Sequence, residues 1–131
     1  MQGLIMGELP PTCGHTEHYF MERFCFIDCR KGGGKLIISA ESHIGIGVKI
    51  LTSSHDIRDG GFGVMIPKNI QIEKEAWIGS FSILYNCTIQ EHAVVGVGSV
   101  VANQVVWPYT MVAGNPAIEI ARFYNGKWHG V

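Results

Sequence analysis

The sequence is short of charge. Asp, Glu, Lys and Arg make up 16% of the 131 residues, against about a quarter in a typical soluble chain. The net charge is −1, and the basic residues form no cluster, which argues against nucleic acid as a partner. No apolar run is long enough to cross a bilayer. The N-terminal residues do not have the pattern of a signal peptide. We therefore expect no membrane association and a cytoplasmic location.

Cysteine is also scarce, with four residues in the chain. Without an export signal, these cysteines are expected to be reduced thiols. A zinc site in the N-terminal part is a second interpretation, because two thiolates and two imidazoles can bind zinc. Its ligands would come from Cys13, His15, His18, Cys25 and Cys29. Their spacing matches no compact zinc-binding pattern, so we favour a capping arm with buried thiols and expect no metal.

What the chain does have is an aliphatic residue at every sixth position. Neither a helix nor a simple strand alternation produces this period, whereas a hexapeptide repeat is typical of a β-helix solenoid. The repeat comprises Ile38, Ile44 and Ile50, then Ile66, Ile72 and Ile78, and, after a slip of one residue, Ile83, Ile89, Val95 and Val101. We predict that these residues point inward and that three hexads form one coil, of about 18 residues.

A small or β-branched residue follows each repeat residue at the fourth position and is expected to fill a corner of the coil. These residues are Ser42, Val48, Ser54, Ile70, Ala76, Ser82, Cys87, Ala93, Ser99 and Val105. Glycine and asparagine are expected where a corner requires positive φ. The candidates are Gly45, Gly47, Gly79, Gly96, Gly98, Asn86 and Asn103. The pattern thus predicts an all-β solenoid built from short strands and tight corners.

The repeat also divides the chain into segments. Residues 1–24 lack it and are expected to form a cap or arm, while residues 25–116 contain the coils. Residues 56–65 interrupt the repeat with three glycines and predict an excursion loop. Residues 117–131 form a short C-terminal tail, in which Asn125-Gly126 predicts a two-residue hairpin turn.

Three stretches carry a resemblance to a known family. They are KILTSSHD (49–56), AWIG (76–79) with VVGVGSVV (94–101), and VAGNPA (112–117). In this order they resemble the hexapeptide-repeat acyltransferases, and among these the saccharide O-acetyltransferases of the galactoside, maltose and colanic-acid type. The resemblance spans residues 36–122. It implies a left-handed parallel β-helix, acetyl-CoA as co-substrate, a saccharide acceptor, and a homotrimer with active sites between subunits.

The resemblance also implies roles for individual residues. His55 matches the general base, which takes a proton from the acceptor hydroxyl. Trp77 matches a tryptophan of the acyl-CoA channel, although it is equally a packing aromatic. Ser80 matches a backbone N–H that binds the oxyanion of the thioester carbonyl. Val97 matches a backbone position beside the pantetheine arm. Asn115 and Pro116 shape the adjacent turn, which has an equally good structural explanation.

Three further residues are implied less directly. Asp56 follows His55 and is expected to orient the imidazole or to bind acceptor hydroxyls. Asp28 is a second acceptor-binding candidate, with a solvated surface carboxylate as the alternative. Related enzymes carry basic residues for the CoA phosphates where this chain has Ala102-Asn103 and Ile118-Glu119, so Arg122 is the first candidate cation of the tail.

Two other functions are considered for this fold. Hexapeptide solenoids include γ-type carbonic anhydrases, which bind zinc through three histidines, two of them five residues apart. The solenoid histidines His43, His55 and His92 contain no such pair. A degenerate solenoid that acts only as a binding or assembly module is the non-catalytic alternative, and binding of CoA distinguishes it from the enzyme.

Overall fold

The protein is built from short strands that wind into coils. The computed structural model describes residues 20–28, 30 and 32–131. Its strands are β1 Phe20–Met21, β2 Phe26–Asp28, β3 Leu36–Ile38, β4 His43–Ile44, β5 Lys49–Leu51, β6 Ser53–His55, β7 Met65–Pro67, β8 Ile70–Ile72, β9 Trp77–Ile78, β10 Ile83–Ile89, β11 Val94–Val95, β12 Val100–Val106, β13 Thr110–Gly114, β14 Ala117–Tyr124 and β15 Lys127–Gly130. The described residues form no helix of a length and apolarity that would cross a lipid bilayer.

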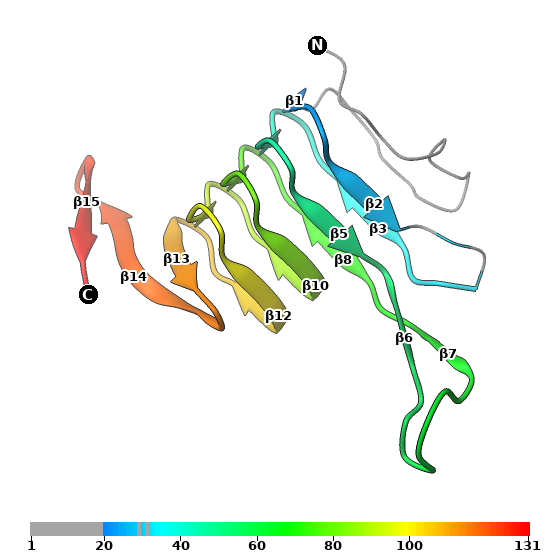
Figure 1. The fold of residues 1–131 in the computed structure, drawn as a ribbon. Coiled ribbons are helices and arrows are strands. Elements are labelled where there is room, and N and C mark those ends of the chain that lie inside the picture. The colour runs from blue at the N-terminus through cyan, green and yellow to red at the C-terminus, as the bar shows by residue number, and fades with distance from the viewer. Residues whose placement is uncertain (1–19, 29, 31) are drawn as a thin grey trace.

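The coils stack as a prism of parallel strands (Figure 1). One face is the sheet β1-β4-β9-β11-β13, which the tail strands β14 and β15 extend. The other two faces share β10 and β12, because these long strands turn a corner. The first half of β10 pairs with β5, and the second half pairs with β8. The prediction of an all-β parallel solenoid is confirmed.

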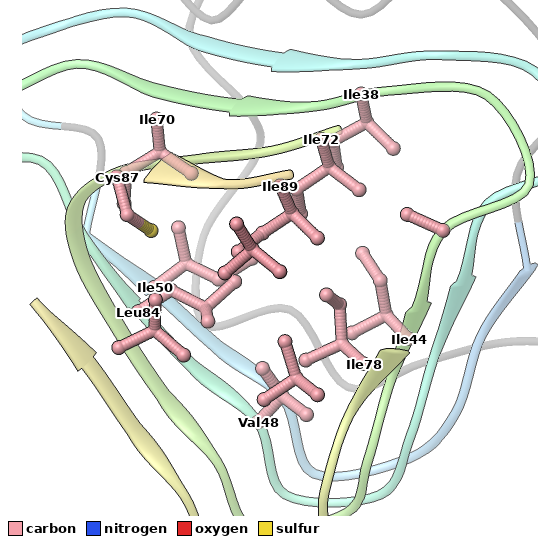
Figure 2. Packing of buried hydrophobic residues seen from close by; sticks show 14 of the residues in the cluster. Ile38, Ile44, Val48, Ile50, Ile70, Ile72, Ile78, Leu84, Cys87 and Ile89 are labelled. Atoms are coloured by element: carbon pink, nitrogen blue, oxygen red, sulfur yellow. The ribbon is translucent and has the colours of Figure 1, made fainter. Parts of the chain in front are cut away.

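Each complete coil after the excursion is one residue shorter than three hexads, so the predicted coil length is wrong for these coils. The register shows this directly, because Trp77 pairs with Val94 and Val94 pairs with Met111. Two six-residue steps and one five-residue step recur in every complete coil after the excursion. Side chains at equivalent positions therefore form columns through the core, and Figure 2 shows Ile38, Ile72 and Ile89 in one such column.

The shorter coil changes which residues are buried. Leu84 is fully buried and takes the place predicted for Ile83, which is only half-buried. The five-residue step thus follows Leu84 rather than Ile78. Ile66 is not a core residue, because it lies in β7 outside the coils. Val105 and Ser54 were predicted to fill corners, but neither is buried, and Val106 occupies the core instead.

Positive φ angles occur at the corners, as expected, but at partly different residues. Gly47, Gly98, Asn86 and Asn103 have positive φ as predicted. Gly45, Gly79 and Gly96 do not, so that prediction is wrong for them. The non-glycine residues with positive φ that the pattern missed are Phe24, Glu41, Glu75, Phe81, His92 and Tyr109. They lie at repeating corner positions, where the coil geometry imposes the left-handed conformation whatever the side chain.

A hairpin projects from the corner between β5 and β8 (Figure 1). Its strands β6 and β7 pair antiparallel, from Ser53 opposite Pro67 to His55 opposite Met65. We call residues 53–67 the arm; it includes the predicted excursion 56–65. Lys49 and Ile83 pair across the arm, and their separation in sequence is twice that of Trp77 and Val94. The arm therefore adds the equivalent of one coil in sequence.

The first and last strands of the stack pair differently. Strand β1 of the expected N-terminal segment pairs parallel with β4, while residues 1–19, with Cys13, His15 and His18, lie outside the described residues, as does Cys29. In the tail, β14 pairs antiparallel with β13 and β15. The predicted turn at Asn125-Gly126 is confirmed, with positive φ at both residues.

Candidate active site

His55 lies at the end of β6, where the arm leaves its paired strands. The imidazole is partly buried. Its Nδ1 atom lies 3.2 Å from the carbonyl oxygen of Gly63, which is on the returning side of the arm. The ring of Phe62 stands edge-on to the imidazole, with ring centroids 5.3 Å apart and an angle of 75°. The chain therefore holds this histidine by contacts within the arm itself.

The neighbouring Asp56 carboxylate is directed at Arg58 rather than at the imidazole. Both oxygens accept hydrogen bonds from the guanidinium, the shortest from a terminal nitrogen at 2.5 Å. The backbone N–H of Arg58 also donates to Oδ1 at 3.0 Å. These hydrogen bonds lower the pKa of Asp56. The carboxylate remains ionised and fixes the turn at the tip of the arm.

Asp28 lies at the end of β2, next to the base of the arm. Its carboxylate accepts two hydrogen bonds from Arg30, at 2.7 and 2.8 Å. The hydroxyl of Ser53 lies 3.4 Å from the second oxygen. Thr52 donates its hydroxyl proton to the backbone carbonyl of Asp28. This network joins the coil before the arm to the first residue of β6, so Asp28 supports the strand that carries His55.

A different corner brings Ser80 and Val97 together. The register of β9, β11 and β13 makes Ser80, Val97 and Gly114 equivalent positions in successive coils. Asn115 is the residue that follows Gly114. Asn115 precedes Pro116 through a cis peptide bond, and both residues are exposed. The N–H of Ser80 makes no hydrogen bond to another described residue, while its hydroxyl accepts one from the N–H of Ile46 at 3.2 Å. The N–H of Ser80 is therefore available to an oxyanion.

Glycines allow the backbones of successive coils to approach closely at this corner. A Cβ atom on Gly45 would lie 2.7 Å from the nitrogen of Ser80, and one on Gly79 would lie 2.6 Å from the oxygen of Val95. A Cβ on Gly96 would lie 2.9 Å from the Cβ of Ala113. Side chains are thus excluded where successive backbones approach. We call the column of residues 46, 80 and 97 with these glycines the glycine corner.

Trp77 and Arg122 complete the predicted set. Trp77 is in β9, between His43 and Val94, and 55% of its surface is exposed. It therefore contributes an outward aromatic face close to the glycine corner. Arg122 lies in β14 and forms an ion pair with Glu119, including a hydrogen bond at 3.1 Å from a terminal nitrogen. The charge that was expected to face a phosphate is partly neutralised within the tail.

Gly63 and Phe62 are the contacts of His55 that sequence reasoning missed. The three glycines identified the loop, but nothing in their spacing showed which carbonyl would meet the imidazole. In the part of the chain that the structure describes, no group of three histidine, cysteine or acidic side chains is placed to hold a metal ion. His43, His55 and His92 accordingly do not converge.

The fold is similar to several solved structures. One is a hexapeptide-repeat acetyltransferase of Vibrio cholerae in complex with acetyl coenzyme A, with 28% identity, a TM-score of 0.70, and coverage of 88% of this chain and 62% of that protein. A galactoside acetyltransferase in complex with coenzyme A matches at 20% identity and a TM-score of 0.72, over 92% of this chain and 63% of that one. The chain thus spans about three fifths of the length of these relatives.

A third match is AntD, an N-acyltransferase from Bacillus cereus in complex with dTDP and 3-hydroxybutyryl-CoA. It is 18% identical, with a TM-score of 0.63, over 88% of this chain and 74% of that protein. No protein-family model matches the chain, and neither does any curated protein. The similarities confirm the left-handed parallel β-helix and the resemblance to hexapeptide-repeat acetyltransferases.

Proposed function

We propose that this structural relative of the hexapeptide-repeat acetyltransferases moves an acetyl group from acetyl-CoA to a hydroxyl of a saccharide. The observation that carries the proposal is His55, an imidazole held by a carbonyl oxygen on an arm that projects from the solenoid. The similarity to the Vibrio cholerae acetyltransferase supports acetyl-CoA as the donor. The match of residues 49–56 to the galactoside, maltose and colanic-acid type supports a saccharide acceptor.

The proposed reaction is a direct transfer. The acceptor oxygen attacks the thioester carbonyl carbon while His55 takes the hydroxyl proton. The carbonyl oxygen becomes an oxyanion, which accepts a hydrogen bond from the N–H of Ser80. The C–S bond then breaks, and the CoA thiolate leaves and receives the proton from the imidazolium. This direct transfer forms no covalent enzyme intermediate. The thiols within the described residues, Cys25 and Cys87, are buried and so are not placed to act as nucleophiles.

The glycine corner fits the donor side of this reaction. Its glycines bring successive coils into close contact, and we propose that an extended pantetheine chain lies along the backbone exposed at this corner. Val97 offers backbone groups there, Trp77 an aromatic face, and Asn115 with Pro116 a turn beside the path. Arg122 is the candidate phosphate contact, although its ion pair with Glu119 weakens it. We therefore expect modest affinity for CoA.

The two halves of the site lie at different corners of one subunit. The arm leaves between β5 and β8 (Figure 1), whereas Ser80 lies between β9 and β10 and Val97 between β11 and β12. We propose that the arm of one subunit meets the glycine corner of the next in a homotrimer. Exposed apolar side chains at both places support this: Ile57, Phe62 and Val64 on the arm, and Phe24, Ile46, Phe81 and Val97 at the corner.

The first prediction tests His55 as the general base. With acetyl-CoA and a panel of saccharides, His55→Ala is expected to lower turnover by about 10²–10⁴-fold, since that is the usual contribution of a general base. The oligomeric state should not change. His92→Ala is the matched control, because His92 pairs with Glu75 at another corner. Undiminished transfer by His55→Ala would refute the proposed role.

An amine acceptor is the second candidate, favoured by the similarity to AntD. The same base and the same oxyanion contact serve an amino sugar, whose nitrogen attacks in place of an oxygen. Parallel assays with a sugar and its amino analogue decide between them. Calorimetric titration with CoA addresses the non-catalytic alternative: absence of binding at millimolar CoA would leave a solenoid that serves only in assembly or binding.

A further inference from the structure

We infer that the tip of the arm is a positioning device for His55, in which the Gly63 carbonyl selects the Nδ1–H tautomer and the Asp56–Arg58 ion pair holds that carbonyl in place. The benefit to catalysis rests on the proposed function. The tautomer itself does not, because it is a property of the free protein. Asp56 and Arg58 would act on the reaction only through the imidazole.

The first step concerns the ring. A carbonyl oxygen is only an acceptor, so the nitrogen 3.2 Å away must carry a proton. A neutral imidazole with its proton on Nδ1 has its lone pair on Nε2. Nε2 is then the basic atom, and it lies on the side of the ring away from Gly63. When Nε2 takes a proton, the Nδ1–H···O bond becomes charge-assisted and therefore stronger.

The second step concerns the carbonyl. The N–H of Gly63 donates to the carbonyl of Asp56 at 2.8 Å, and the N–H of Asp56 donates to the carbonyl of Val64 at 3.0 Å. These two bonds continue the β6–β7 ladder past His55. A Cβ atom on Gly63 would lie only 2.3 Å from the oxygen of Asp56. The close approach therefore requires glycine, and it fixes the direction of the Gly63 peptide.

The third step concerns the turn that closes the tip. Asp56 binds both the backbone N–H and the guanidinium of Arg58, and Gly60 donates to the carbonyl of Ile57 at 3.0 Å. The chain is thus guided from Asp56 back to Phe62 and Gly63. Phe62, 91% exposed, places its ring edge-on to the imidazole and limits rotation of His55.

The experiment uses the full-length ¹⁵N-labelled protein and histidine ¹⁵N–¹H correlation spectra at a pH where His55 is neutral. The His55 signals are assigned by comparison with His55→Gln. The expected spectrum shows the proton on Nδ1. In Asp56→Asn and in Arg58→Gln the ion pair is lost, so the Nε2–H form should gain population. Asp59→Asn is the matched control: Asp59 is an exposed carboxylate on the same turn, and the substitution is the same.

Kinetics supply the second readout. Asp56→Asn should lower kcat by about tenfold, which is less than the whole ~10²–10⁴-fold contribution of a general base, with a smaller change in the KM for acceptor. Asp59→Asn should change neither quantity. A wild-type spectrum with the proton on Nε2 would overturn the inference. So would an Asp56→Asn variant that raises KM while the tautomer stays the same, because Asp56 would then bind the acceptor. If His55→Ala shows no loss of transfer, the proposed function fails. The tautomer is decided separately, by the histidine spectra of the free protein.

Discussion

Burial keeps the thiols in the described part of the chain protonated and therefore unreactive. Burial raises the pKa of Cys87 to about 12. Burial also raises the pKa of Cys25, whose thiol donates to the carbonyl of Gly45 at 3.1 Å. At neutral pH both groups are uncharged and unreactive. They fill space in the core, as small apolar residues do.

Cys87 makes stability dependent on alkaline pH. Its folded-state pKa of about 12 lies above the ordinary value of 9.0, so the native state favours the neutral thiol. The resulting stability is fully present below pH 9 and is lost as the pH rises toward 12. We expect the melting temperature of the native protein to fall in this range, and to fall less steeply in Cys87→Ala. Equal slopes for the two proteins would contradict the burial effect.

Candidate site residues could be proposed from the sequence where a local segment carries them. His55 is proposed from the residues that flank it, because the strand and its exit from the coil are local features. Its partner Gly63 lies across a turn, just before β7 begins at Met65, and a carbonyl has no signature in a sequence. The ion pair between Asp56 and Arg58 was missed for a related reason. The residues suit several partners, and only the path of the turn decides among them.

At the scale of elements, the six-residue period located the strands but not the corner that is one residue shorter. Leu84 and Ile83 are both aliphatic and adjacent, so composition cannot tell which one points inward. Register decides: Ile50, Leu84 and Val101 are partners across three coils. The corner glycines illustrate the same limit, because close backbone contact and positive φ both favour glycine.

Two alanine substitutions distinguish the predicted core residue from the observed one. Leu84→Ala removes a fully buried side chain and should lower the free energy of unfolding by about 2–5 kcal/mol. Ile83→Ala trims a half-buried side chain and should cost about 1 kcal/mol or less. Chemical denaturation of both variants measures the difference. A larger loss for Ile83→Ala would mean that the register of β10 is wrong.

For the molecule as a whole, the proposed trimer determines whether a complete site exists. We expect sedimentation equilibrium to give three times the 14.4 kDa mass of the chain. Phe81→Asp, in the exposed apolar set at the glycine corner, should dissociate the subunits and abolish transfer together. Val105→Asp, on a different face, is the control and should affect neither. A monomeric wild-type protein with full activity would rule out a site shared between subunits.

After the arm, the chain rejoins the stack in the register that the other coils keep. The strands on either side of the arm, β5 and β8, both pair with β10, so the coils continue as though nothing had been inserted. A change of length or composition at the tip therefore does not propagate into the scaffold. The length of the arm and the number of coils can change separately, and duplication of one whole coil lengthens the prism by one strand spacing of about 4.8 Å. Elaboration of the arm and growth of the scaffold are thus independent in this architecture.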